Sequence, residues 1–146
     1  MSYTPMTHDP EAAMREHRER LYWLTLATGV VNIIALAMHL AGMTSAFIGP
    51  LIGGMCGSLI VAGMKGNTDG YYQSLVSEGL RWMAAALGVG LLVLWADADS
   101  SLVERFIPRF DILAKDSLLL ALILSLFFHA GYAFAYLRDL IFAGAE

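Results

Sequence analysis

The chain has 146 residues, enough for one domain. Hydrophobic residues make up 58% of it and charged residues only 15%, against about 25% in soluble domains, so the composition favours a membrane protein. The net charge of −4 comes with no basic stripe, which argues against nucleic-acid binding, and a single cysteine excludes an intramolecular disulfide or a CxxC motif.

The N-terminal part predicts a long charged helix that continues into the first membrane span. Asp9, Pro10 and Glu11 form a helix start signal, with an N-cap, a proline at the first helical position and an acid in the first turn. The charged stretch then runs without a helix breaker into the apolar residues 21–41, about 30 Å of helix. The charged helix ahead of this run argues against a signal peptide.

The second predicted span, residues 45–64, carries three glycines at four-residue intervals, Gly49, Gly53 and Gly57. Such positions stack on one helix face, so they form a groove without side chains. In lipid, close packing rather than hydrophobicity drives helix association. We therefore predict that this glycine groove is a helix-packing surface and that the other spans are arranged around it. Cys56, in the same span, is interpreted as a small apolar filler.

The third predicted helix begins after Asp69, which is expected to cap it. Its first turns, through Gly79, are expected at the membrane surface, and its span covers residues 80–96. Trp82 and Trp95 mark the two ends of this span, as an aromatic belt would.

The longest polar connection, residues 97–115, separates the third span from the fourth. Apolar residues at helical spacing within it predict a short helix on the membrane surface, broken at Pro108. The fourth span is predicted at residues 117–137. The prediction is therefore an all-α, integral membrane four-helix bundle forming a single domain over residues 1–146, with a charged N-terminal helix extension and one interfacial helix.

Four spans place both chain termini on the same side of the membrane. That side would carry six basic residues and the other side three, namely Arg15, Arg18, Arg20, Lys65, Arg81 and Arg138 against Arg105, Arg109 and Lys115. The positive-inside rule then predicts that both termini are cytoplasmic, in the inner membrane of a bacterium.

Polar side chains in the first and fourth spans each keep to one helix face. At about 100° per residue, each set falls within a sector of roughly 60°. A polar group that faces lipid has no partner, so both stripes are predicted to face the protein interior. We call the following residues the polar seam: Thr25, Thr28, Asn32, Ser125, His129, Tyr132 and Tyr136. Helical rise places Asn32 and His129 at similar depth, which predicts a hydrogen bond between them.

His39 shares the stripe of the first span but lies near the outer membrane surface. Its depth differs from that of His129 by roughly 15 Å, whereas two axial haem ligands must lie at nearly equal depth. The two histidines are therefore not expected to hold a haem. The acidic residues Asp97, Asp99 and Glu104 lack regular ligand spacing, so no metal site and no cofactor is predicted.

The sequence contains none of the common catalytic motifs, so an enzyme is not expected. No charged residue lies deep within a span, which argues against an ion-coupled transporter. The glycine groove favours a non-catalytic accessory or assembly subunit that packs against partner transmembrane helices in the bilayer, as a homo- or hetero-oligomer. Two alternatives stay open. One is a small oligomeric channel or transporter lined by the polar seam. The other is a membrane redox or cofactor-binding subunit that uses His129, for a quinone or for a haem shared with a partner.

Overall fold

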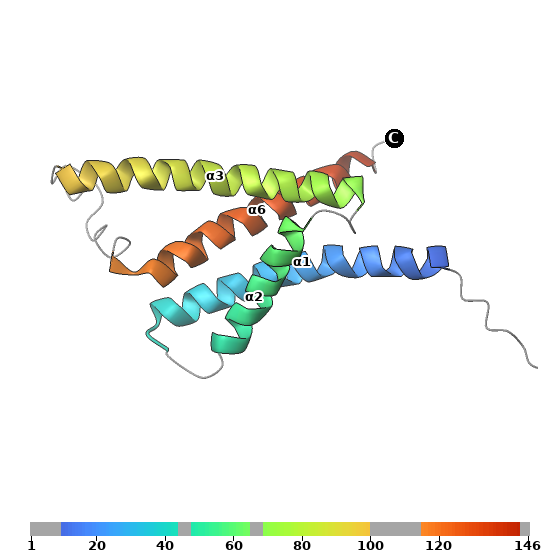
Figure 1. The fold of residues 1–146 in the computed structure, drawn as a ribbon, viewed down its shortest axis with the longest axis horizontal. Helices are drawn as coiled ribbons and strands as arrows, with labels where there is room; N and C mark the ends of the chain where they lie inside the picture. The colour runs from blue at the N-terminus through green and yellow to red at the C-terminus, as the bar shows by residue number, and fades with distance from the viewer. Residues whose placement is uncertain (1–9, 44–47, 65–68, 100–114, 144–146) are drawn as a thin grey trace, which may run out of the picture.

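The computed structural model describes residues 10–43, 48–64, 69–99 and 115–143. These residues form four α-helices and no strand: α1 (Pro10–Leu40), α2 (Ile48–Gly63), α3 (Gly70–Asp99) and α6 (Ser117–Ala143) (Figure 1). The all-α prediction is confirmed. The interfacial helix predicted between the third and fourth spans lies outside the described residues.

Three of these helices are long and apolar enough to cross a membrane, over Glu19–Leu40, Gly70–Ala96 and Ser117–Phe142. The apolar part of α2, Gly49–Gly63, is shorter. At 1.5 Å per residue it covers about 22 Å, less than the roughly 30 Å of a bilayer core. The structure therefore supports three of the four predicted spans by length and composition, and α2 alone does not reach the length of a span.

Helix α1 begins at Pro10, as predicted, and continues through the charged stretch into the apolar run without a break. It ends in a Schellman motif, in which Met43 N–H donates to the Met38 carbonyl and Gly42 N–H donates to the His39 carbonyl, both at 3.0 Å. Gly42 has φ 69°, in the left-handed region that side chains disfavour, so glycine is needed to stop the helix here.

The helices are arranged around α6 rather than around the glycine helix α2, so the predicted arrangement is wrong in this respect. Helix α6 lies between α3 and α1, and its contact with α3 is the most extensive in the molecule (Figure 1). Helix α2 packs mainly on α1. The start of α1 and the end of α6 lie at the same end of the bundle (Figure 1).

The close contact between α3 and α6 depends on one glycine from each helix. A Cβ added at Gly79 of α3 would lie 2.7 Å from the backbone oxygen of Phe128, and one added at Gly131 of α6 would lie 2.7 Å from the Trp82 side chain. Both distances are shorter than the contacts that Cβ atoms make in real proteins. The helices therefore approach at backbone distance because neither position carries a side chain.

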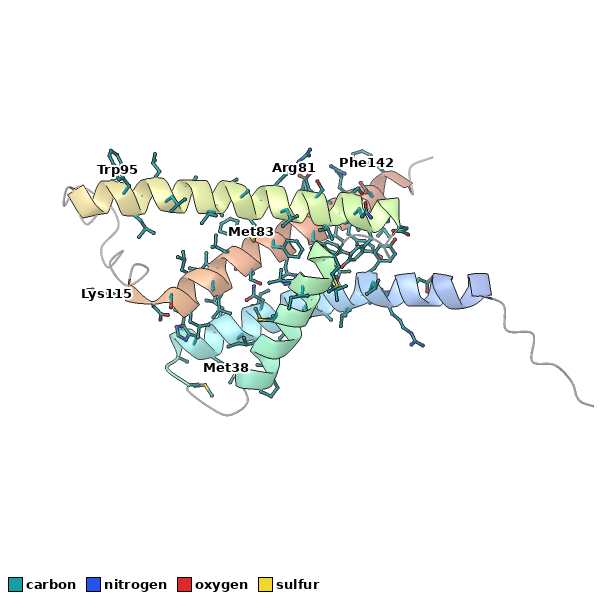
Figure 2. All side chains as sticks on the ribbon, viewed as in Figure 1. Met38, Arg81, Met83, Trp95, Lys115 and Phe142 are labelled. Atoms are coloured by element: carbon teal, nitrogen blue, oxygen red, sulfur yellow. The ribbon has the colours of Figure 1, made fainter. Side chains whose placement is uncertain are left out.

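The main hydrophobic core lies at this contact and contains Tyr72, Leu75, Val76, Phe128, Tyr132 and Ala135. Three of these residues belong to the first turns of α3, which the sequence analysis placed at the membrane surface. These turns are packed against α6 and α1, and their depth in the membrane stays a prediction. Figure 2 shows Met83 pointing from α3 toward α6, whereas Arg81 and Trp95 point away from it.

The outward faces of the helices are rich in exposed large apolar side chains. Leu92 and Trp95 of α3 and Ile141 of α6 are 66–70% exposed. A soluble protein rarely presents apolar surface on this scale, so these faces, like the three long apolar helices, indicate a membrane protein.

A glycine at the α3–α6 contact and a glycine of the groove on α2 should respond differently to an added methyl group. We expect Gly79→Ala to destabilise the protein by about 1–3 kcal/mol, because the added carbon meets the Phe128 backbone, which cannot move aside cheaply. Gly53→Ala, where an added Cβ meets nothing within 4 Å, should leave stability unchanged or slightly higher. Thermal unfolding in detergent measures both changes, and equal midpoints for the two variants would show that the α3–α6 contact is not formed as described.

Candidate functional site

The polar stripes of α1 and α6 both face the protein interior, as predicted. Tyr136 is half-buried, and the other six residues of the polar seam have exposed fractions of only 0–6%: Thr25, Thr28, Asn32, Ser125, His129 and Tyr132. The seam therefore lies within the contacts that α1 and α6 make with each other and with α2 and α3.

On one flank, α1 is joined to α2 by a hydrogen bond of 3.0 Å between the Thr28 and Ser58 hydroxyls, both buried. Thr28 Oγ1 also lies 2.9 Å from the backbone oxygen of Thr25, in its own helix. Ser58 was not predicted as part of the seam. Its signal in the sequence is that it lies on the side of α2 away from the glycine groove, about 140° from the centre of that face, where contact with the rest of the bundle is to be expected.

At the end of the bundle where α1 begins and α6 ends, α1 is joined to α3. Asp69 caps α3 as predicted, since its carboxylate accepts the Tyr72 N–H at 2.7 Å. The same carboxylate lies 2.7 and 2.8 Å from the Tyr22 hydroxyl of α1, and the Tyr72 hydroxyl lies 3.1 Å from Thr25 Oγ1. Tyr22 and Tyr72 were not predicted. The spacing of Tyr72, Leu75, Val76 and Gly79 at i, i+3, i+4 and i+7 is the signal that could have found the second of them.

At the opposite end, α1 is joined to α6 by His39 and Asp116. Asp116 caps α6 by accepting the Leu119 N–H at 2.9 Å, and its other oxygen lies 2.6 Å from His39 Nε2. The hydrogen bond from the Leu119 amide is the main cause that holds the pKa of Asp116 below its usual range, and the hydrogen bond with His39 is the second cause. His39 is therefore an end contact of the bundle and not part of its centre.

The predicted hydrogen bond between Asn32 and His129 is wrong. Asn32 Nδ2 donates instead to the Leu122 backbone oxygen at 3.2 Å. His129 packs against Gly29, where an added Cβ would lie 3.1 Å from the His129 Cβ. Gly29 is one turn before Asn32, about 4.5 Å along the axis, so the two side chains are out of register by that amount.

The same geometry keeps the two histidines of the seam stripes apart. His129 is level with Gly29, and His39 lies ten residues further along α1, about 15 Å away. The described residues contain no group of three or more His, Cys, Asp or Glu side chains that could hold a metal ion.

The centre of the seam contains five buried polar atoms with no hydrogen-bond partner among the described residues: Asn32 Oδ1, Ser125 Oγ, His129 Nδ1, His129 Nε2 and Tyr132 Oη. Thr25 lies close to both His129 and Tyr132, but not in hydrogen-bond geometry. Unpaired buried polar atoms are rare and each costs free energy, so this group is the strongest candidate for a functional site.

A crevice of about 310 Å³ lies between α1 and α6, and His129 is the one residue of this group in its lining. His129 is the one polar side chain in its lining, which is otherwise apolar: Leu26, Gly29, Val30, Ile33, Leu126, Ala130 and Ala133.

The glycine groove lies on the outer side of α2. Gly49, Gly53 and Gly57 are exposed, and a Cβ added at any of them would meet nothing within 4 Å among the described residues. No described helix of this chain packs into the groove.

Comparison with protein-family models, with curated proteins and with solved structures gives no match. The site must therefore be interpreted from its own geometry.

The Asp116 contact predicts a pH-dependent loss of stability. Because the folded-state pKa is lowered, the contact stabilises the fold above the ordinary carboxyl pKa of about 4 and loses this contribution as the pH falls through the lowered value. We expect Asp116→Asn to lower the thermal midpoint at pH 7 and to differ less from wild type below about pH 4. Glu78→Gln, which breaks only a surface pair with Arg81, should have little effect at either pH.

A second prediction compares two pairs of seam residues by double-mutant cycles. Thr28→Ala with Ser58→Ala should show a coupling energy of about 0.6 kcal/mol, the average for membrane hydrogen bonds. Asn32→Leu with His129→Leu should show almost none, since these side chains do not bond each other. Detergent stability of the single and double mutants is the readout, and the reverse ranking would contradict the α1–α6 register.

Proposed function

We propose that this protein is a non-catalytic accessory or assembly subunit of a membrane complex, and that the glycine groove of α2 receives a transmembrane helix of a partner. The observation that carries the proposal is the open groove itself, Gly49, Gly53 and Gly57, with no described atom near any added Cβ. Against lipid, a face of glycines makes few van der Waals contacts, whereas a helix seated in the groove makes many.

The two faces of α2 support this division. Met55 and Ser58 are buried on the side that meets α1, and Cys56 is exposed beside the groove. One side of α2 thus holds the helix on its own chain, and the other side is free for assembly. The partner is either a second copy of the chain or a different membrane protein. The excess of basic residues places both termini in the cytoplasm in this proposal.

A channel or transporter lined by the seam is a weaker proposal for a single chain. A buried apolar cluster, Ala35, Met55 and Leu122, lies between Asn32 and the His39–Asp116 pair. Polar groups therefore do not continue from the centre of the seam to that end of the bundle.

The proposal predicts that Gly53→Leu abolishes assembly while leaving the isolated chain folded. The added side chain would fill the groove and hold a partner helix away, whereas none of the described residues of its own chain opposes it. Gly54→Leu is the matched control, because residue 54 is exposed and has equal space but points about 100° away from Gly53.

Assembly is measured by native mass spectrometry and by pull-down from membranes in mild detergent. A photo-reactive maleimide on Cys56, the only cysteine of the chain, should label the partner in wild type and in Gly54→Leu but not in Gly53→Leu. Equal assembly of both leucine variants would show that the groove faces lipid and that the proposed function is wrong.

A further inference from the structure

The unpaired atoms at the centre of the seam call for a partner that the described helices do not supply. His129 and Tyr132 are 4% and 0% exposed, and neither a nitrogen of the first nor the hydroxyl of the second is hydrogen-bonded. Ser125 Oγ, one turn away on the same face of α6, is also buried and has no hydrogen-bond partner among the described residues. Together these groups can both donate and accept hydrogen bonds.

The crevice between α1 and α6 borders His129, and three of the residues that line it are small. Ala130 and Ala133 form part of its α6 side, and Gly29 forms part of its α1 side. A Cβ at residue 29 would lie 3.1 Å from the His129 Cβ and 3.7 Å from its Nδ1, so glycine allows α1 to lie close against His129. An apolar cleft of this volume with one polar residue in its lining has the character of a small-molecule site.

The depth of His129 restricts what can bind there. It lies 12 residues after Ser117 and 14 before Ala143, so it is about 18 and 21 Å from the two ends of α6, near the middle of the span. The polar head of a phospholipid stays at the membrane surface and does not reach this depth. A ligand that brings an oxygen atom to mid-membrane must itself dissolve in hydrocarbon.

We propose that the α1–α6 crevice binds a lipid-soluble quinone, with its ring against His129 and its tail among the apolar walls of the crevice. A quinone ring carries oxygen atoms on an apolar body. The oxygen accepts a hydrogen bond as the quinone and can donate one as the quinol, so it suits a neutral imidazole in either form. Both His129 nitrogens are covered in the free protein, so in this proposal the imidazole turns about its broad χ2 torsion to present one of them to the quinone. The site is separate from the glycine groove, so it does not depend on the proposed function.

Binding is tested with purified full-length protein in detergent, using decylubiquinone as the probe. Complexes are isolated by gel filtration and the bound quinone is quantified by its absorbance. We expect saturable binding near one quinone per chain. Decylbenzene, which has a tail and a ring but no oxygen, should compete weakly.

Three variants locate the site. His129→Leu should weaken binding by about fivefold, the equivalent of one ordinary hydrogen bond. Ala130→Leu should weaken it by about tenfold or more, because the added side chain fills the crevice. The matched control is Ala84→Leu, at an exposed position of α3, which should bind as wild type does.

A second readout stays valid even where His129→Leu does not fold. In protein labelled with ¹⁵N-histidine, decylubiquinone should shift one of the four histidine signals in wild type and none in Ala130→Leu. An absence of saturable binding would overturn the proposal. So would equal binding of decylbenzene, or binding that survives Ala130→Leu.

Discussion

The fold depends on the close approach of α3 and α6 at Gly79 and Gly131. Each glycine receives an aromatic residue of the other helix, Phe128 against Gly79 and Trp82 against Gly131. This contact occupies one face of α6 and forms the main core with the first turns of α3. The remaining inward face of α6, which carries Ser125 and His129, is thereby directed to α1. Gly29 then allows α1 to approach His129 in the same way.

The sequence was sufficient to predict which faces of α1 and α6 are buried. Thr25 and Asn32 on α1, and Ser125 and His129 on α6, each follow a stripe at helical period, and burial of a stripe is required by the absence of partners in lipid. The stripe does not define the axial register, because depth was counted from span ends that hydropathy locates only within a few residues. Helix α6 continues to Ala143, six residues past the predicted end of its span, and a shift of one turn was enough to separate Asn32 from His129.

Glycine spacing shows a similar limit. The run at Gly49, Gly53 and Gly57 was conspicuous and proved to be open, whereas the close contacts involve the isolated Gly29, Gly79 and Gly131. A glycine permits close approach, but it does not specify which helix will approach. That choice is made by the aromatic and apolar residues on the opposing helix, and these are recognised only when the pairing of helices is known. Tyr72 was missed for the same reason, because the polar residues around it suggested a surface turn.

The contrast between the ends and the centre of the bundle separates stability from function. At each end an N-cap carboxylate both completes a helix and holds α1, with Asp69 bound to Tyr22 and Asp116 bound to His39. Both carboxylates also lie where the helix dipole favours negative charge. The centre has no such stabilising hydrogen bonds for its histidine, serine and tyrosine, which are buried without partners among the described residues. Replacing such groups by apolar side chains of similar shape is often neutral or stabilising, so packing alone does not account for a histidine at residue 129.

Helix α1 has two distinct flanks. On one flank, Thr28 joins α1 to α2, the helix that carries the open groove. On the other flank, Gly29, one residue further along, lines the crevice. Assembly on α2 and binding at His129 would therefore both act through the same turn of α1.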